Sequence, residues 1–186
     1  MYHNNLDFYV ITGGPGAGKT TLLHQLKERG YTVMPEDARR IIKEQMAAKQ
    51  DGLPWADKKR YGMLMLEAAV ETYERAVASN QAPIFFDRGL LDVVCYMTME
   101  NIDVRPLMTT ALSKCRYRQQ VFILPPWKAI YHADSERKQN WEDAVYTFEQ
   151  MSKTYQSFGY NLIEVPRVPV NQRAQFVLKA ILQTLK

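Results

Sequence analysis

The sequence has few cysteines and no long apolar run, and these absences exclude several classes of protein. Its 186 residues include only Cys95 and Cys115, which form no Cys-x-x-Cys pair and lie in no His-rich cluster. No apolar run approaches the ~20 residues that cross a bilayer, so no membrane span is predicted. The N-terminus lacks a basic region followed by an apolar stretch, so we expect no secretory signal. We therefore expect a cytoplasmic protein with reduced cysteines.

The net charge is also small, at +4, and no long basic run occurs. This mild balance fits the binding of anionic small molecules. Neither a basic stripe nor an aromatic stacking platform stands out, so no nucleic-acid partner is predicted. The Asn-Lys-x-Asp motif of guanine-reading switches is absent, and so is a transporter signature sequence. These absences argue against a GTP switch and against a transport ATPase.

What is present is an alternation of strand-like and helix-like segments, which is typical of an α/β protein. Hydrophobic residues make up 46% and charged residues 24%, and the length suits a single domain over residues 1–186. We predict a P-loop NTPase fold of the nucleoside and nucleotide kinase type, with a parallel sheet, helices on both of its faces and a lid. The five predicted strands are Phe8–Thr12, Tyr31–Met34, Ala82–Phe86, Gln120–Leu124 and Asn161–Val165.

The segment "YVITGGPGAGKTTLLHQL" matches the P-loop spacing of glycine, four residues, then Gly-Lys-Thr. A short strand pattern precedes it, and a leucine stripe that ends near Gly30 follows it, as the motif requires. The alternative is a glycine-rich turn before an ordinary helix, but strand, loop, helix and cap all agree with nucleotide binding. The residues predicted to bind ATP are Gly13, Gly14, Pro15, Gly16, Ala17, Gly18, Lys19, Thr20 and Thr21.

The residue types of this loop follow from the chemistry of a phosphate. Backbone N–H groups can approach a phosphate only where Cβ atoms do not obstruct them, and the start of the helix adds partial positive charge. Lys19 should reach the β- and γ-phosphates, and we expect it to take part in catalysis. The Thr20 hydroxyl should be one ligand of Mg²⁺.

The segment "PIFFDRG" is an apolar strand that ends in an acid, as a Walker B strand does. Ligands of such sheets lie at the carboxyl ends of the strands, so Asp87 is predicted to hold Mg²⁺ directly or through water. Arg88 follows at once and could steady a phosphate or the transferring group. The alternative is an exposed Asp–Arg pair that starts a turn.

The segment "MPEDARR" places a second acid, Glu36, at the end of the second predicted strand. In a kinase this position faces the γ-phosphate from the acceptor side, so Glu36 could accept the proton of an attacking hydroxyl. We therefore predict Glu36, Arg39 and Arg88 to bind the acceptor. The alternative is a helix N-cap, because Glu36 and Asp37 precede the helical segment "ARRIIKEQM".

A polar segment, "PPWKAIYHADSERKQNW", follows the fourth predicted strand at residues 125–141. It lies where P-loop kinases carry a lid that excludes water, and the lid itself is predicted at about residues 126–140. Arg137 is predicted to neutralise charge that develops during transfer. Lys128, His132 and Lys138 are expected to be solvated.

Six motifs occur in an order that resembles a family of small P-loop proteins, usually called AAA-domain ATP-binding proteins. They are "GGPGAGKTTL", "VMPEDARR", "FDRGLLDVVCY", "VFILPPW", "YHADSERK" and "TYQSFGYNLIEVP". The resemblance spans Tyr9 to about Arg173. It extends to the ribosylnicotinamide kinase part of bifunctional NAD-salvage enzymes and, more distantly, to deoxynucleoside kinases. It implies that Glu36 is a catalytic base and that Asp87 and Arg88 serve Mg²⁺ and phosphate.

Two classes of function remain open on this evidence. The first is an ATP-dependent kinase that phosphorylates a hydroxyl of a small molecule, such as a nucleoside or riboside, by positioning and charge stabilisation. The second is a nucleotide-binding regulatory module or an ATPase without a small-molecule acceptor. Release of ADP that depends on the acceptor distinguishes the first from the second.

Overall fold

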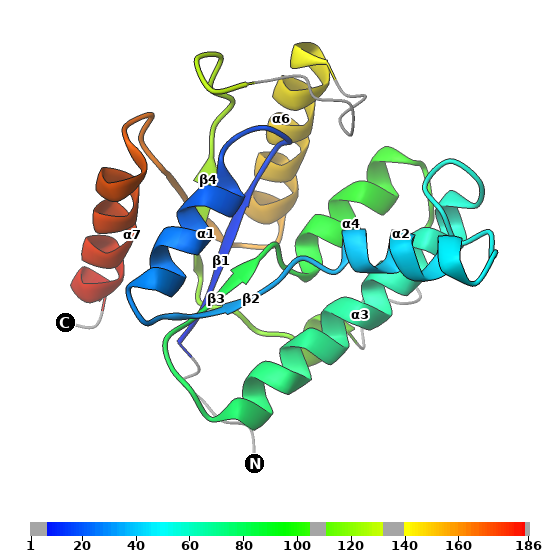
Figure 1. Cartoon of the computed structure of the whole chain (residues 1–186), viewed down its shortest axis with the longest axis horizontal. Helices are drawn as coiled ribbons and strands as arrows, with labels where there is room; N and C mark the ends of the chain where they lie inside the picture. The colour runs from blue at the N-terminus through cyan, green and yellow to red at the C-terminus, as the bar shows by residue number, and fades with distance from the viewer. Residues whose placement is uncertain (1–6, 105–110, 132–139, 185–186) are drawn as a thin grey trace.

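Five parallel strands form one sheet, as the sequence predicts, and their order is β2-β3-β1-β4-β5 (Figure 1). The computed structural model describes residues 7–104, 111–131 and 140–184. The strands are β1 (Phe8–Gly13), β2 (Thr32–Met34), β3 (Ile84–Asp87), β4 (Gln120–Leu124) and β5 (Asn161–Glu164). The strand before the P-loop is therefore central, with β3 and β4 as its neighbours.

Helices lie on both faces of this sheet, which agrees with the predicted architecture (Figure 1). The helices are α1 (Lys19–Glu28), α2 (Ala38–Ala47), α3 (Lys58–Ser79), α4 (Leu90–Met99), α6 (Trp141–Ser157) and α7 (Val170–Thr184). In the described part of the chain, no helix combines the length and the apolar character that crossing a membrane requires.

Every residue of β1 is buried, so its side chains alternate between two cores. Phe8 and Val10 belong to the core beneath α3 and α4, whereas Tyr9 and Ile11 belong to the core beneath α1 and α7. Figure 1 shows α1 and α7 side by side, away from α2, α3 and α4. A strand that is enclosed in this way gives the loop after Gly13 a rigid base.

The helix after the P-loop, α1, ends next to Gly30, as the sequence predicts. The backbone N–H of Gly30 donates to the Lys27 carbonyl at 2.9 Å, and that of Tyr31 donates to the Leu26 carbonyl at 3.2 Å. Gly30 is in the left-handed region with φ of 87°. These two bonds make a Schellman motif, which ends α1 and turns the chain into β2.

Two strands begin later than predicted, each for a local reason. Tyr31 was expected in the second strand, but its N–H closes the end of α1, so β2 begins at Thr32. The third strand begins at Ile84 rather than Ala82 because Pro83 has no N–H to donate to a neighbouring strand. The lid prediction falls largely outside the described residues, since 132–139 are not described.

The core under α1 provides a test of this packing. Leu26 on α1 is fully buried, whereas Leu182 on α7 is 63% exposed. Leu26→Ala should lower the free energy of unfolding by about 2–5 kcal/mol, because it removes buried methyl groups and leaves a cavity. Leu182→Ala is the matched control and should change it by less than about 0.5 kcal/mol. Urea denaturation measures both values, and equal losses would contradict the placement of α1 on the sheet.

Candidate active site

The P-loop lies between β1 and α1, and its glycines adopt conformations that other residues rarely take. Gly16 and Gly18 have φ of 72° and 84°. Gly13 has φ of 140°, and a Cβ atom there would lie 2.5 Å from the Leu124 carbonyl oxygen of β4. A side chain at Gly13 would therefore push apart two neighbouring strands. The loop keeps a bare backbone surface at the start of α1, as phosphate binding requires.

The Lys19 side chain curls back over the loop. Its Nζ donates to the carbonyl oxygens of Gly13 at 2.9 Å and Gly14 at 3.0 Å. Burial and, secondarily, the Arg88 charge lower the pKa of Lys19 to about 7. An anion bound in the loop would favour the charged form of Lys19, because a negative charge attracts the ammonium group more strongly than two neutral carbonyl groups do.

The other predicted nucleotide contacts differ in exposure. Ala17 is buried in the core beneath α1 and α7, whereas Thr20 and Thr21 are exposed at the start of α1. Pro15 borders the large cavity described below. Thr20 is therefore accessible in the first turn of α1, directly after the loop.

Asp87 ends β3 beside the P-loop strand, and one of its oxygens has an unusual environment. Asp87 Oδ1 is buried and has no hydrogen-bond partner among the described residues. Burial raises the pKa of Asp87 to about 6; Glu36 and Asp92 add to this, while Lys19 and Arg88 oppose it. A buried carboxylate oxygen without a donor is a ligand that Mg²⁺ prefers, so Asp87 fits such an ion. The part given to Thr20 stays a prediction.

The described residues contain no group of three His, Cys, Asp or Glu side chains that could hold a metal by themselves. This agrees with the chemistry of magnesium in phosphoryl-transfer sites. There, one or two protein groups and the substrate phosphates hold the ion, together with several water molecules.

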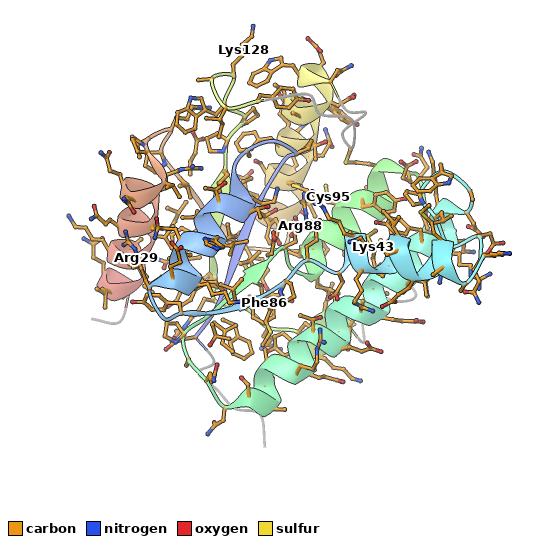
Figure 2. All side chains as sticks on the ribbon, viewed as in Figure 1. Arg29, Lys43, Phe86, Arg88, Cys95 and Lys128 are labelled. Carbon is orange, nitrogen blue, oxygen red and sulfur yellow. The ribbon has the colours of Figure 1, made fainter. Side chains whose placement is uncertain are left out.

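Arg88 and Glu36 form an ion pair, with Arg88 Nε 2.8 Å from Glu36 Oε1. Burial raises the pKa of Glu36, but the charges of Arg88 and Lys19 outweigh it, and the pKa lies below its usual value. Figure 2 shows Arg88 in the interior, between the helices, whereas Lys128 lies at the edge of the molecule. Glu36 is therefore ionised at neutral pH, and the hydrogen bond from Arg88 holds its carboxylate at Oε1.

Asp37, not Glu36, occupies the N-cap position of α2, but its side chain makes no capping hydrogen bond. Its carboxylate accepts instead from Arg40 Nη2 at 3.0 Å and from Thr72 Oγ1 at 2.6 Å. The Glu36 carboxylate turns away from the helix toward Arg88. Of the two acids that the sequence leaves as cap candidates, Asp37 occupies the cap position.

A cavity of about 420 Å³ opens beside Glu36 and Arg88. It lies among α2, α3, α4 and α6, and it borders the P-loop at Pro15 and the end of β3 at Asp87. Aromatic rings contribute much of its wall, namely Tyr61, Phe86, Tyr96 and Tyr117. A pocket of this size with polar groups at one end can hold a small ring-bearing molecule.

The predicted roles of two site residues do not follow from this cavity. Arg39 is exposed and does not line the cavity, although its charge contributes to the lowered pKa of Glu36. Arg137 lies outside the described residues. The roles given to both residues remain predictions.

Sequence reasoning missed Asp92, which lies at the centre of the site. Asp92 accepts hydrogen bonds from Thr12 at the end of β1, from Arg88 Nη1 at 3.1 Å and from the Tyr155 hydroxyl on α6 at 2.6 Å. The motif "FDRGLLDVVCY", which contributes to the family resemblance, contains this acid, but the sequence analysis assigns it no role.

Residues 8–173 match the family described as an AAA domain. The chain belongs to this family. This assignment confirms the resemblance to small P-loop proteins that the motifs indicate. A search of curated proteins gave no match.

Several solved structures share the fold of this AAA-domain chain. NadR in complex with NR has a TM-score of 0.71 and is 18% identical over 95% of this chain and 50% of that one, so this chain spans about half the length of NadR. Deoxyadenosine kinase from M. mycoides has a TM-score of 0.61 at 18% identity, covering 96% and 100% of the two chains. Thymidylate kinase from Ehrlichia chaffeensis has a TM-score of 0.62 at 14% identity, covering 94% and 97%. At these identities the likeness establishes a P-loop fold of the nucleoside and nucleotide kinase type.

Lys19 provides the first test of the site. Lys19→Ala should weaken ATP·Mg²⁺ binding about 10- to 100-fold, because it removes a charged donor to phosphate. Lys27→Ala, at the other end of α1, is the matched control and should leave the affinity unchanged. Isothermal titration calorimetry measures the affinity, and circular dichroism checks that α1 is intact. Equal affinity in the parent and Lys19→Ala would remove the phosphate role from this loop.

Asp87 provides the second test. Asp87→Asn should raise the Mg²⁺ concentration that half-saturates ATP binding, because an amide oxygen is a weaker ligand than a carboxylate. Burial disfavours the charge of Asp87, so its removal should not lower the melting temperature at pH 7 without metal. An unchanged Mg²⁺ dependence would make Asp87 a structural residue.

Proposed function

We propose that the chain transfers the γ-phosphate of ATP to a hydroxyl group of a small molecule, such as a nucleoside or riboside. The single observation that carries this proposal is the position of Glu36. Its ionised carboxylate lines a cavity that also borders the P-loop at Pro15 and the end of β3 at Asp87. An acceptor in the cavity would therefore lie between a proton acceptor and the predicted phosphate site.

Different residues of this chain would perform different parts of the reaction. The P-loop backbone and Lys19 would hold the triphosphate, and Thr20 and Asp87 would hold Mg²⁺. When bound, the ion would neutralise part of the phosphate charge. Glu36 would orient the acceptor hydroxyl and take its proton as the oxygen bonds to the γ-phosphorus. The bond from that phosphorus to the β–γ bridging oxygen breaks, and ADP leaves.

The walls of the cavity support a ring-bearing acceptor. Tyr61 and Tyr96 pack edge to face with ring centroids 5.5 Å apart, and Phe86 and Tyr117 do so at 5.1 Å. Rings that are fixed in this way offer flat apolar surfaces against which another ring can pack. Arg88 is already paired with Glu36 and Asp92, so it is not a free cation for an acceptor that carries a phosphate.

Glu36→Gln tests the function directly. The amide keeps the shape of the side chain but cannot take the proton, so acceptor phosphorylation should fall ~10²–10⁴-fold while ATP affinity holds. Glu44→Gln, an exposed acid on α2, is the matched control and should leave the rate unchanged. The measurement is ADP release with and without a panel of nucleosides and ribosides.

Three outcomes are distinguishable in this experiment. Acceptor-dependent ADP release that Glu36→Gln abolishes supports the kinase. ATP hydrolysis that no acceptor accelerates supports an ATPase, and tight nucleotide binding without turnover supports a regulatory module. If Glu36→Gln leaves the rate of acceptor phosphorylation intact, Glu36 has no part in the mechanism.

A further inference from the structure

Asp92 is only 5% exposed, yet its carboxylate accepts four hydrogen bonds. Oδ1 accepts from Thr12 Oγ1 and from Arg88 Nη1 at 3.1 Å. Oδ2 accepts from the Gly89 backbone N–H at 2.8 Å and from the Tyr155 hydroxyl at 2.6 Å. A buried carboxylate is stable only when donors or a cation satisfy it, and here each oxygen has two donors.

The four donors come from segments that are far apart in the chain. Thr12 lies one residue before the end of β1, Arg88 and Gly89 form the turn after β3, and Tyr155 is on α6. Tyr155 is fully buried, and burial together with the Asp92 charge raises its pKa well above the usual value, so it remains a donor. Asp92 therefore connects α6 to the residues around the P-loop and the cavity.

Arg88 depends on these contacts for its conformation. Its backbone is in the left-handed region, with φ of 71°, which is unfavourable for a residue with a side chain. Its guanidinium is held on one side by Glu36 at 2.8 Å and on the other by Asp92 at 3.1 Å. Such a conformation persists only where the surroundings fix it, and loss of either carboxylate leaves the guanidinium held from one side only.

We propose that Asp92 and Tyr155 are positioning residues that fix the Arg88–Glu36 ion pair, so that helix α6 sets the orientation of the carboxylate that faces the acceptor. The order of contact is Tyr155 hydroxyl, Asp92 carboxylate, Arg88 guanidinium and Glu36 carboxylate. The kinetic part of this proposal rests on the proposed function, whereas the structural part does not.

A simpler role for Asp92 explains one of its four contacts. Asp92 is the third residue of α4, and its bond to the Gly89 N–H is a helix-capping contact. Asp143 occupies the same position in α6, where its carboxylate accepts from the Asn140 N–H at 3.0 Å, and it is exposed. Asp143→Asn thus weakens a capping contact alone, because the amide keeps one oxygen acceptor but loses the charge, and it serves as the matched control for Asp92→Asn.

The structural part can be tested in the protein without any substrate. The Arg88 Nε–H resonance is assigned by its disappearance in Arg88→Lys, and its exchange with solvent is then measured by nuclear magnetic resonance. Tyr155→Phe and Asp92→Asn should each accelerate this exchange at least about tenfold, because each weakens a hydrogen bond to a charged group in the chain of contacts. Tyr146→Phe, at a 52% exposed tyrosine of the same helix, and Asp143→Asn should leave it unchanged.

Unchanged exchange in both Tyr155→Phe and Asp92→Asn would overturn the proposal. Tyr155→Phe is the milder change, because it removes one hydroxyl and leaves every charge in place. It therefore decides the question if Asp92→Asn does not fold, as circular dichroism would show.

The kinetic part of the proposal is tested by introducing Tyr155→Phe into two proteins, the parent and the Glu36→Gln variant. In the parent, Tyr155→Phe should lower kcat for the acceptor about tenfold and leave KM for ATP unchanged, since its effect passes through Glu36. In the Glu36→Gln background the same change should have no further effect, because residues that act as a unit are not additive. An equal loss in both backgrounds would overturn the proposal. If the parent phosphorylates no acceptor, the proposed function fails, and the exchange measurement still decides the role of Asp92 and Tyr155.

Discussion

The site depends on one constraint, which is that β1 pairs in parallel on both edges and is buried on both faces. Its partners are β3 on one side and β4 on the other. Because β2 also runs parallel, the ends of β1, β2 and β3 lie at the same edge of the sheet. The P-loop follows the end of β1, Glu36 lies just after the end of β2, and Asp87 is the last residue of β3. The topology therefore brings them together from distant parts of the sequence.

The charges at this edge determine one another. Lys19 and Arg88 are the cations, and Glu36, Asp87 and Asp92 are the acids. Together with burial, their charges shift the pKa values of Lys19, Glu36 and Asp87. One buried and two partly buried acids are tolerable because two cations and several donors lie among them. A triphosphate would add further negative charge to a group that is already acidic on balance. We therefore expect nucleotide binding here to require a divalent cation, which agrees with the unpartnered oxygen of Asp87.

The sequence predicts those parts of the protein that local patterns encode. Strand patterns, the P-loop spacing and Gly30 each depend on residues close in sequence, and they predict the fold class, the nucleotide loop and the end of α1. The Asp92 contacts could not be predicted in this way, because Thr12 is 80 residues from Asp92 and Tyr155 is 63 residues from it. The choice between Glu36 and Asp37 as helix cap also required the structure, since adjacent acids have equivalent patterns.

The low pKa of Glu36 is compatible with a role as proton acceptor because of the nature of phosphoryl transfer. A carboxylate paired with arginine is a weaker base than a free one, and catalytic bases usually have a pKa near the working pH. In phosphoryl transfer, however, the bond to the leaving group is largely broken before the acceptor oxygen bonds to phosphorus. The acceptor hydroxyl then becomes acidic late in the reaction, so the orientation of Glu36 matters more than its basicity. Orientation is what the contacts of Arg88 supply, and the burial of Asp92 and Tyr155 beneath them makes that orientation rigid.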